Sequence, residues 1–456
     1  MHEKLAKALD YISDRHIAEA AGAKGQRRYW LCAVAAVLAV VLLISLFSGP
    51  MTLQAKAVSV ASESRQADRD GDFDIWYAEM EQREAATLEA LSSLSEFFAD
   101  SSARYMAAGQ AENRVWSPVN AFMALAALAE TTGGNSRQQI LEVLGTENLD
   151  TLRAQVGALW ESVYRDDGHE ISVLANSLWL DEGLSYDQAV MDNLAYFDYA
   201  SVYQCDLGSP KSVKALQTWL NKNTGNLLKQ YTKEAVFPGE AVMTLASTVY
   251  LQAKWGSPFS AAKNTQGAFH APGGDITCTF MNKKELQTDY YWGDSFGAVG
   301  LDLKNGCTMW FFLPDAGKTV ADVLDEGEYL DVITQKSENN QYLKVNLSVP
   351  KFDISSGGDL KEMFQALGVT DIFSPETADF TAITADTPVV ITSVNQAARV
   401  LIDEEGVKAA SYIELPGAGA APPPEETIDF VLDRPFLFVI EAGGGIPLFV
   451  GAVNQP

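Results

Sequence analysis

One uncharged stretch of the chain, residues 29–47, constrains its folding more than any other feature. It reads YWLCAVAAVLAVVLLISLF and contains 19 residues without a single Asp, Glu, Lys, Arg or His. As an α-helix, such a run is about 28 Å long, close to the roughly 30 Å of hydrocarbon in a lipid bilayer. The sequence therefore predicts a single transmembrane helix over residues 29–47.

The charges on either side of this stretch predict its orientation. Lys24, Arg27 and Arg28 directly precede it, whereas the first basic residue after it is Lys56. Because basic residues collect on the cytoplasmic side of a membrane, we expect residues 1–28 in the cytoplasm as a short amphipathic segment. Everything after the span is then extracellular in a single-pass membrane protein.

A cleaved signal peptide is the alternative to an anchor. Ala55, Lys56 and Ala57 resemble a small-x-small processing site, and cleavage after Ala57 would release the exported part. The apolar run is long for a signal peptide and starts late in the chain, which favours an uncleaved anchor. Residues 48–87 are polar and acidic, so we interpret them as a stalk that links the anchor to a folded domain.

Composition limits what the exported part can do. The chain has 60 acidic and 33 basic residues, a net charge of −27, so we expect no nucleic-acid partner. With four His residues and no HExxH, Walker or paired CxxC motif, we expect neither a metal site nor a cofactor. After the span, Cys205, Cys278 and Cys307 can form at most one disulfide, so packing must stabilise the fold.

Hydrophobic periodicity predicts a mixed α+β domain. We expect helices at residues 86–106, from Ser117 and Pro118 onward, and near residues 358–368. Helices concentrate in the first half and strands in the second, which argues against a regular βαβ alternation. Strand-like apolar runs lie at residues 171–180, 241–255, 307–314, 343–352 and 435–442.

One enzyme motif has to be weighed. Gly293, Ser295 and Gly297 match GxSxG, the nucleophile elbow of serine hydrolases, which needs a His later in the chain. The last histidine, His270, precedes Ser295, so the order fails and a turn between strands is the better interpretation. We therefore expect that the protein is not an enzyme.

A long segment of small residues and prolines joins two strand-like runs near the C-terminus. Connections of more than about 12 to 15 residues within a compact domain are usually functional or disordered. The first half of this segment has the alternation of a strand, and its members on one face are Val407, Ala409, Ser411, Ile413 and Leu415.

Several separated motifs lie in a fixed order along the chain. Residues 403–410 read DEEGVKAA, residues 433–438 read DRPFLF and residues 447–451 read PLFVG. Further pieces precede them: Asn113 to Pro118 with Gly134 and Asn135, Ala175 with Asn176, Tyr250 to Trp255 with Pro258 and Phe259, and Val349 to Phe352.

With these motifs the chain resembles the serpin family from about residue 88 to Pro456. The resemblance implies the serpin fold over residues 88–456, with three β-sheets, about nine helices and an exposed reactive-centre loop. It also implies suicide inhibition of serine proteases. The protease attacks the loop as a substrate and forms an acyl-enzyme, and the cleaved loop then inserts into the main sheet as a new strand.

The resemblance also assigns the scissile bond. The family's usual spacing of fourteen residues from Gly406 places this bond between Ala420 and Ala421, within one or two positions. Pro422 makes the bond before it a poor substrate, which supports this count. A small residue before the cut suits a shallow pocket, so we expect elastase-like or subtilisin-like serine proteases as partners.

Two further groups of residues take roles from the resemblance. Gln396 and Ser247 stand where serpins usually carry a His and an Asn that pair, so we expect a compensating polar pair at these two positions. Pro416 has no amide donor, so it would remove one ladder hydrogen bond if it became part of a central strand. The expected hinge consists of Glu404, Glu405, Gly406, Val407, Lys408, Ala409, Ala410 and Ser411. The expected residues of the breach and shutter regions, where the sheet opens, are Trp255, Ser117, Pro118, Ser247 and Gln396.

A non-inhibitory serpin that acts as a cell-surface binding or structural module is the alternative function. The small residues of the hinge favour an inhibitor, because bulky residues there would stall insertion. The single span and the few cysteines suggest a bacterial source for a membrane-anchored protein of this kind.

Overall fold

The computed structural model describes residues 55–61, 73–109, 111–166, 171–239, 241–304, 306–325, 327–385, 388–392, 394–407 and 424–456. The predicted cytoplasmic segment, the predicted transmembrane helix and part of the predicted stalk lie outside these residues. In the part of the chain that the structure describes, no helix is both long enough and apolar enough to cross a membrane.

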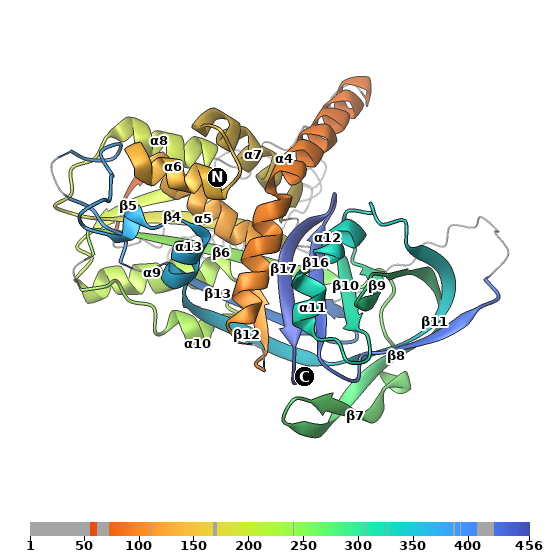
Figure 1. Cartoon of the computed structure of the whole chain (residues 1–456). Helices are drawn as coiled ribbons and strands as arrows, with labels where there is room; N and C mark the ends of the chain where they lie inside the picture. The colour runs from red at the N-terminus through yellow and green to blue at the C-terminus, as the bar shows by residue number, and fades with distance from the viewer. Residues whose placement is uncertain are drawn as a thin grey trace, which may run out of the picture. The chain divides into compact units, whose positions relative to one another are not determined.

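Most helices lie in the first half of the chain, as the periodicity predicts (Figure 1). The helix expected at residues 86–106 is α4, which already begins at Phe73, and the one expected near residues 358–368 is α13. The α-helices are α4 (Phe73–Ala107), α5 (Pro118–Thr131), α6 (Gly134–Val143), α7 (Leu149–Val163), α8 (Gln188–Phe197), α9 (Pro210–Asn223), α10 (Lys229–Thr232), α11 (Val320–Asp325), α12 (Glu328–Ile333) and α13 (Lys361–Leu367), and short 3-10 helices lie at Ala261–Lys263 and Asp371–Phe373.

Three sheets organise the described residues. The first has the order β1-β5-β4-β6-β14, with β3 paired to β4, and the second has the order β15-β11-β8-β9-β10-β16-β17-β2, with β7 paired to β8. The third consists of β12 and β13 alone. The five predicted apolar runs correspond to β4, β6, β10, β11 and β16 within a few residues.

The strands have the following bounds. Those of the first sheet are β1 (Lys56–Ser59), β3 (Arg165–Asp166), β4 (Ile171–Asp181), β5 (Ala200–Cys205), β6 (Met243–Lys254) and β14 (Gly406–Val407). Those of the second are β2 (Arg114–Trp116), β7 (Thr265–Ala271), β8 (Gly274–Trp292), β9 (Phe296–Asp302), β10 (Thr308–Pro314), β11 (Asn340–Pro350), β15 (Thr427–Val431), β16 (Phe436–Ala442) and β17 (Ile446–Val453). The third sheet contains β12 (Phe352–Asp359) and β13 (Asn395–Ile402).

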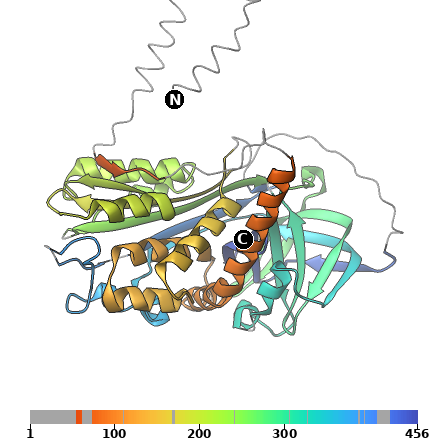
Figure 2. The same ribbon diagram turned by 90° about the horizontal axis from the view of Figure 1, so that it is seen from above.

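Helix α5 forms the centre of the core. The Ser117 hydroxyl accepts a hydrogen bond from the Asn120 amide at 3.3 Å, and Pro118 occupies the first turn, where its missing N–H costs nothing. All 14 residues of α5 are buried, because α5 packs against α4, β6 and β17. Helix α4 also packs against β17 (Figure 2). A helix that is apolar on almost every side is therefore enclosed by other elements, as the sequence predicts.

Part of the segment expected as a stalk is folded. β1 pairs antiparallel with β5, with Lys56 opposite Gln204, and the amide of Ala61 donates to the Ser201 hydroxyl at 3.2 Å. Helix α4 then begins at Phe73. The segment predicted as a stalk, residues 48–87, therefore contains an edge strand and the start of α4, because a polar composition does not prevent an edge strand from pairing through its backbone.

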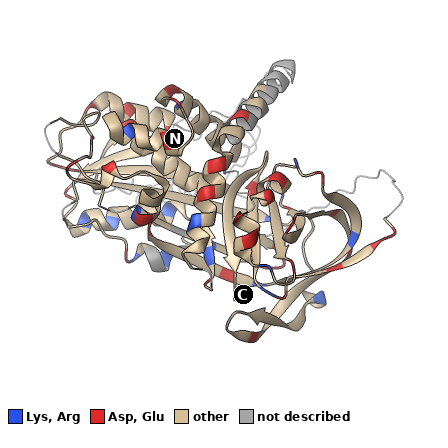
Figure 3. Ribbon diagram, in the orientation of Figure 1, with Lys and Arg blue, Asp and Glu red and all other residues tan. Residues whose placement is uncertain are grey.

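Charged residues are spread over the folded part. Acidic residues occur on α11 and α12, whereas several lysines lie on α9 and α10 (Figure 3). Of the cysteines after the predicted span, Cys205 and Cys307 are buried thiols and Cys278 is half-buried.

Candidate functional site

The first sheet is open beside β6. On one edge, β6 pairs with β4 from Met243 opposite Leu180 to Gln252 opposite Ile171. On its other edge, among the described residues, it pairs only with the two residues of β14. β13 lies beside β6 but forms its ladder with β12 (Figure 1). An opening between β6 and β13 therefore interrupts what would otherwise be a continuous sheet.

The expected hinge begins at one end of this opening. Gly406 and Val407 pair with Lys254 and Ala253, and the Val407 side chain is buried. Gly406 has φ +155°, and a Cβ at this position would lie 2.4 Å from the carbonyl oxygen of Ala253. Only glycine fits at such a close approach of two backbones. The structure thus explains why the hinge contains Gly406.

Trp255 holds the turn in which the hinge begins. Its indole Nε1 donates to the carbonyl oxygen of Asp403 at 2.8 Å, and its amide donates to the carbonyl oxygen of Glu405 at 3.1 Å. The ring is fully buried and lies edge-on to Phe259, with ring centroids 5.6 Å apart. Trp255 is therefore both a core residue and a contact of the hinge.

Glu404, the first residue of the expected hinge, forms a charged contact. Its carboxylate lies 2.5 Å from Lys351 Nζ, and it also accepts a hydrogen bond from Asn264 Nδ2. Burial raises the pKa of Glu404, but the hydrogen bonds from Lys351 and Asn264 outweigh it, so the pKa lies below its ordinary value. Sequence motifs gave no role to Lys351 or Asn264, because only folding brings them to Glu404.

Polar side chains lie beneath the opening, near the start of α5. The Ser247 hydroxyl of β6 lies 2.5 Å from Oδ1 of Asn120 and 2.5 Å from Oδ1 of Asn176. Gln396 of β13 donates to the carbonyl oxygen of Ser117 at 3.3 Å and accepts from its amide at 3.5 Å. The prediction of a direct Ser247–Gln396 pair is therefore wrong, because these described side chains bond to α5 and β4 rather than to each other.

Both side chains nevertheless line one small cavity. Leu245 and Ser247 of β6, Val394, Gln396 of β13 and Asn120 of α5 are among the residues that line it. The structure thus brings Ser247 and Gln396 to one cavity, and Gln396 bonds to Ser117 beside it. The sequence contained no sign that Asn120 and Asn176 join them.

Several expected site residues lie outside the described residues. They are Lys408, Ala409, Ala410 and Ser411 of the hinge, Pro416, and the expected scissile pair Ala420 and Ala421.

The GxSxG motif has no hydrolase geometry. Ser295 is fully buried directly before β9, and its carbonyl oxygen accepts a hydrogen bond from the Asp315 amide at 2.8 Å. His270 Nδ1 instead contacts Asp275 Oδ1, at 2.8 Å. The motif forms the turn between β8, which ends at Trp292, and β9, which begins at Phe296, as predicted.

Comparison with known protein families identifies the chain. A family model described as "Serpin (serine protease inhibitor)" matches residues 93–456. Serpin-ZX of Arabidopsis thaliana is 28% identical over 369 residues, which cover 76% of this chain and 93% of that protein. The alpha-1-antiproteinase of Callosciurus caniceps is 27% identical over 352 residues, which cover 75% of this chain and 83% of that protein.

Solved structures agree with this assignment. Arabidopsis AtSerpin1 in its native stressed conformation is 26% identical, with a TM-score of 0.70, and the match covers 81% of this chain and 98% of that one. The thermophilic serpin Tengpin in its native state is 21% identical, with a TM-score of 0.71, and the match covers 88% of this chain and 100% of that one. At this identity the likeness supports the fold alone. Because the family model matches most of the chain, the protein belongs to the serpin family of serine protease inhibitors.

Proposed function

We propose that the protein inhibits serine proteases by loop cleavage followed by insertion of the cleaved loop between β6 and β13. The observation that carries this proposal is the opening itself, with Gly406 and Val407 already paired to one end of β6. An inserted strand would gain a partner on this side of β6, where the described residues supply one only for Ala253 and Lys254.

The register of β14 supports the proposal. Continued antiparallel from Val407 opposite Ala253, it would place Ala409 opposite Leu251 and Ser411 opposite Val249. Side chains on opposite residues share a face of the sheet, so these two would follow the buried Val407 toward the core. Both are small, which suits a position between two existing strands.

The same register bears on Pro416. This residue would lie opposite Thr244, the second residue of β6. The missing amide donor would then affect only the far end of the new ladder, so most of the inserted strand would pair before reaching Pro416. The proline is therefore compatible with insertion.

The proposed targets are elastase-like or subtilisin-like proteases. The spacing from Gly406 puts the scissile bond between Ala420 and Ala421, and Pro422 protects the bond that follows. Alanine fills a shallow specificity pocket and offers no charge to a trypsin-like one.

We also propose that residues 29–47 anchor the protein in a membrane with the serpin domain outside the cell. The uncharged run and the basic residues before it support this topology. Ala57 lies within β1, opposite Tyr203, so processing at this position would cut a strand of the first sheet. This placement favours an anchor that stays uncleaved. The expected bacterial source has no support from the relatives named above, which come from a plant and a mammal.

The test is adduct formation by the full chain in detergent. Mixed with an elastase and a subtilisin, it should give a covalent product of summed mass on a denaturing gel, and mass spectrometry should find a released peptide that begins at Ala421 or a neighbour. The variant Ala420→Arg should transfer adduct formation to trypsin, whereas Ala418→Arg serves as the matched control. Cleavage in the loop without an adduct would contradict inhibition and favour a binding or structural module.

A further inference from the structure

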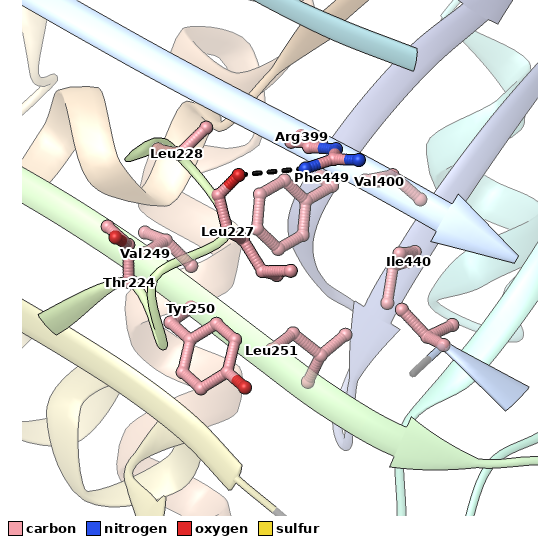
Figure 4. A pocket seen from close by; sticks show the side chains of 11 residues that line it. Thr224, Leu227, Leu228, Val249, Tyr250, Leu251, Arg399, Val400, Ile440 and Phe449 are labelled. Carbon is pink, nitrogen blue, oxygen red and sulfur yellow. Dashed lines mark hydrogen bonds between the residues drawn. The ribbon is translucent and has the colours of Figure 1, made fainter. Parts of the chain in front are cut away.

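A second cavity is lined by residues of β6 and β13 and by Val407 of the hinge. Figure 4 shows it between Val249 and Leu251 of β6 and Val400 of β13. The Leu227 side chain enters it from the segment that joins α9 to α10. This segment, residues 224–228, therefore covers the gap into which an inserted strand would have to pass.

The covering segment lies directly against β6 at one end. Gly225 and Asn226 both have left-handed backbone, with φ +54° and +62°, and so turn the chain sharply after α9. A Cβ on Gly225 would lie 2.3 Å from Tyr250 Cζ, so the backbone rests directly on this ring of β6. Only glycine permits so close a contact between the segment and β6.

The same segment is bound to β13 at its other end. Arg399 Nη1 donates to the carbonyl oxygen of Leu227 at 2.9 Å (Figure 4). The Arg399 guanidinium is oriented by Asp353 of β12, whose two carboxylate oxygens accept from Nε at 2.8 Å and from Nη2 at 2.6 Å. A guanidinium held in this bidentate way donates strongly to a third acceptor with little loss of side-chain freedom.

We propose that Leu227 and Arg399 form a latch across the opening, and that release of this latch limits the rate of strand insertion. This inference rests on the insertion mechanism proposed above. A strand inserted between β6 and β13 occupies about 4.8 Å in the hydrogen-bonding direction. If residues 224–228 stay on Tyr250 while β13 moves away by that distance, the Arg399–Leu227 bond of 2.9 Å cannot persist.

The latch lies where insertion beyond the hinge would begin. In the register of β14, residues 409 to 411 would lie opposite Leu251 to Val249, which line the cavity that Leu227 enters. Val407 can pair without disturbing Leu227, whereas the next residues cannot. Arg399 is thus a positioning residue, which acts on insertion through the covering segment and does not touch the protease.

The test measures insertion without a protease. A synthetic peptide with the sequence of residues 408–420, KAASYIELPGAGA, is incubated with the full chain in detergent, and native mass spectrometry follows the annealed complex. Arg399→Ala should anneal the peptide about tenfold faster than the natural chain, since it removes a hydrogen bond to a charged group. Leu227→Ala, which keeps the carbonyl acceptor, should also accelerate annealing. Arg399→Lys should return the rate toward that of the natural chain.

A matched control separates the latch from general loss of stability. Arg137 Nε also donates to a backbone carbonyl, that of Ala129 at 3.0 Å, but it lies on α6 and does not line the cavity. Arg137→Ala should leave the annealing rate within about twofold, and thermal unfolding is recorded for every variant. Equal rates for Arg399→Ala and the natural chain would overturn the latch while leaving the inhibitory function standing. Annealing to no variant at all would contradict insertion itself.

Discussion

Trp255 Nε1 donates a 2.8 Å hydrogen bond to the carbonyl oxygen of Asp403, and this bond joins the end of β6 to the turn in which the hinge begins. The bond links a buried aromatic ring to the short segment from which the reactive loop departs. It therefore fixes where an inserting strand would start.

Replacing Trp255 by Phe tests this link. Trp255→Phe keeps most of the buried ring but leaves the Asp403 carbonyl without its donor, so it should lower the free energy of unfolding by about 1 kcal/mol. Urea unfolding of the full chain measures the change. Trp292→Phe, at a ring that is 39% exposed, is the control and should have a much smaller effect. An equal effect of the two would show that the bond contributes nothing.

The Glu404 contact predicts a pH dependence of stability. Because the folded pKa of Glu404 lies below its ordinary value of 4.5, the unfolded chain takes up its proton at higher pH than the folded chain. The stabilisation is therefore present above about pH 4.5 and is lost as the pH falls through the folded pKa. Glu404→Gln should reduce the acid-side slope of unfolding free energy against pH. Glu405→Gln, at the exposed neighbouring residue, is the control. Identical acid-side slopes of unfolding free energy for the two variants would refute this account.

Gly406 tests the close approach of the hinge to β6. Gly406→Ala would place a Cβ 2.4 Å from the Ala253 carbonyl oxygen, so β14 should detach from β6 or shift. We expect a stability loss of about 1 to 3 kcal/mol, the usual cost of overpacking. Gly239→Ala, where no atom lies within 4 Å, should be neutral. Thermal unfolding of both variants decides whether the contact constrains the hinge.

Val407 tests whether the hinge must enter the sheet. Its side chain is 4% exposed in β14, so Val407→Arg would place a positive charge at a buried position that valine occupies. Burying a charge without a paired group of opposite charge is strongly unfavourable. The variant should still be cut by the target protease but should form little covalent adduct, because insertion becomes slower than release of the protease. Val236→Arg, at a side chain that is 62% exposed, should keep full adduct formation. A normal adduct yield with Val407→Arg would show that this residue need not insert.

Much of the fold follows from periodicity and motifs. The buried α5 and the apolar strands β4, β6, β10, β11 and β16 lie where the sequence predicts them, because their hydrophobic patterns are long and regular. β1 is not predicted, since a four-residue edge strand with two exposed and two half-buried side chains has no such pattern. Its pairing depends on β5, about 140 residues further along the chain.

The site could be predicted only in part. The hinge and Trp255 follow from motifs, and the structure places Glu404 to Val407 beside Trp255. The Ser247–Gln396 pair was wrong because the reach of each side chain depends on the backbone of α5, which a motif does not define. Lys351, Asn264 and the Arg399–Leu227 bond join elements distant in sequence, so no local pattern could reveal them.

Hydrogen exchange of the two strands beside the opening tests insertion most directly. Peptides covering residues 243–254 and 395–402 are followed by mass spectrometry before and after the reactive loop is cleaved. If the cleaved loop becomes a strand between β6 and β13, their amides gain partners and should exchange at least tenfold more slowly. Unchanged exchange in both peptides after complete cleavage would contradict the central claim that the loop inserts into the sheet.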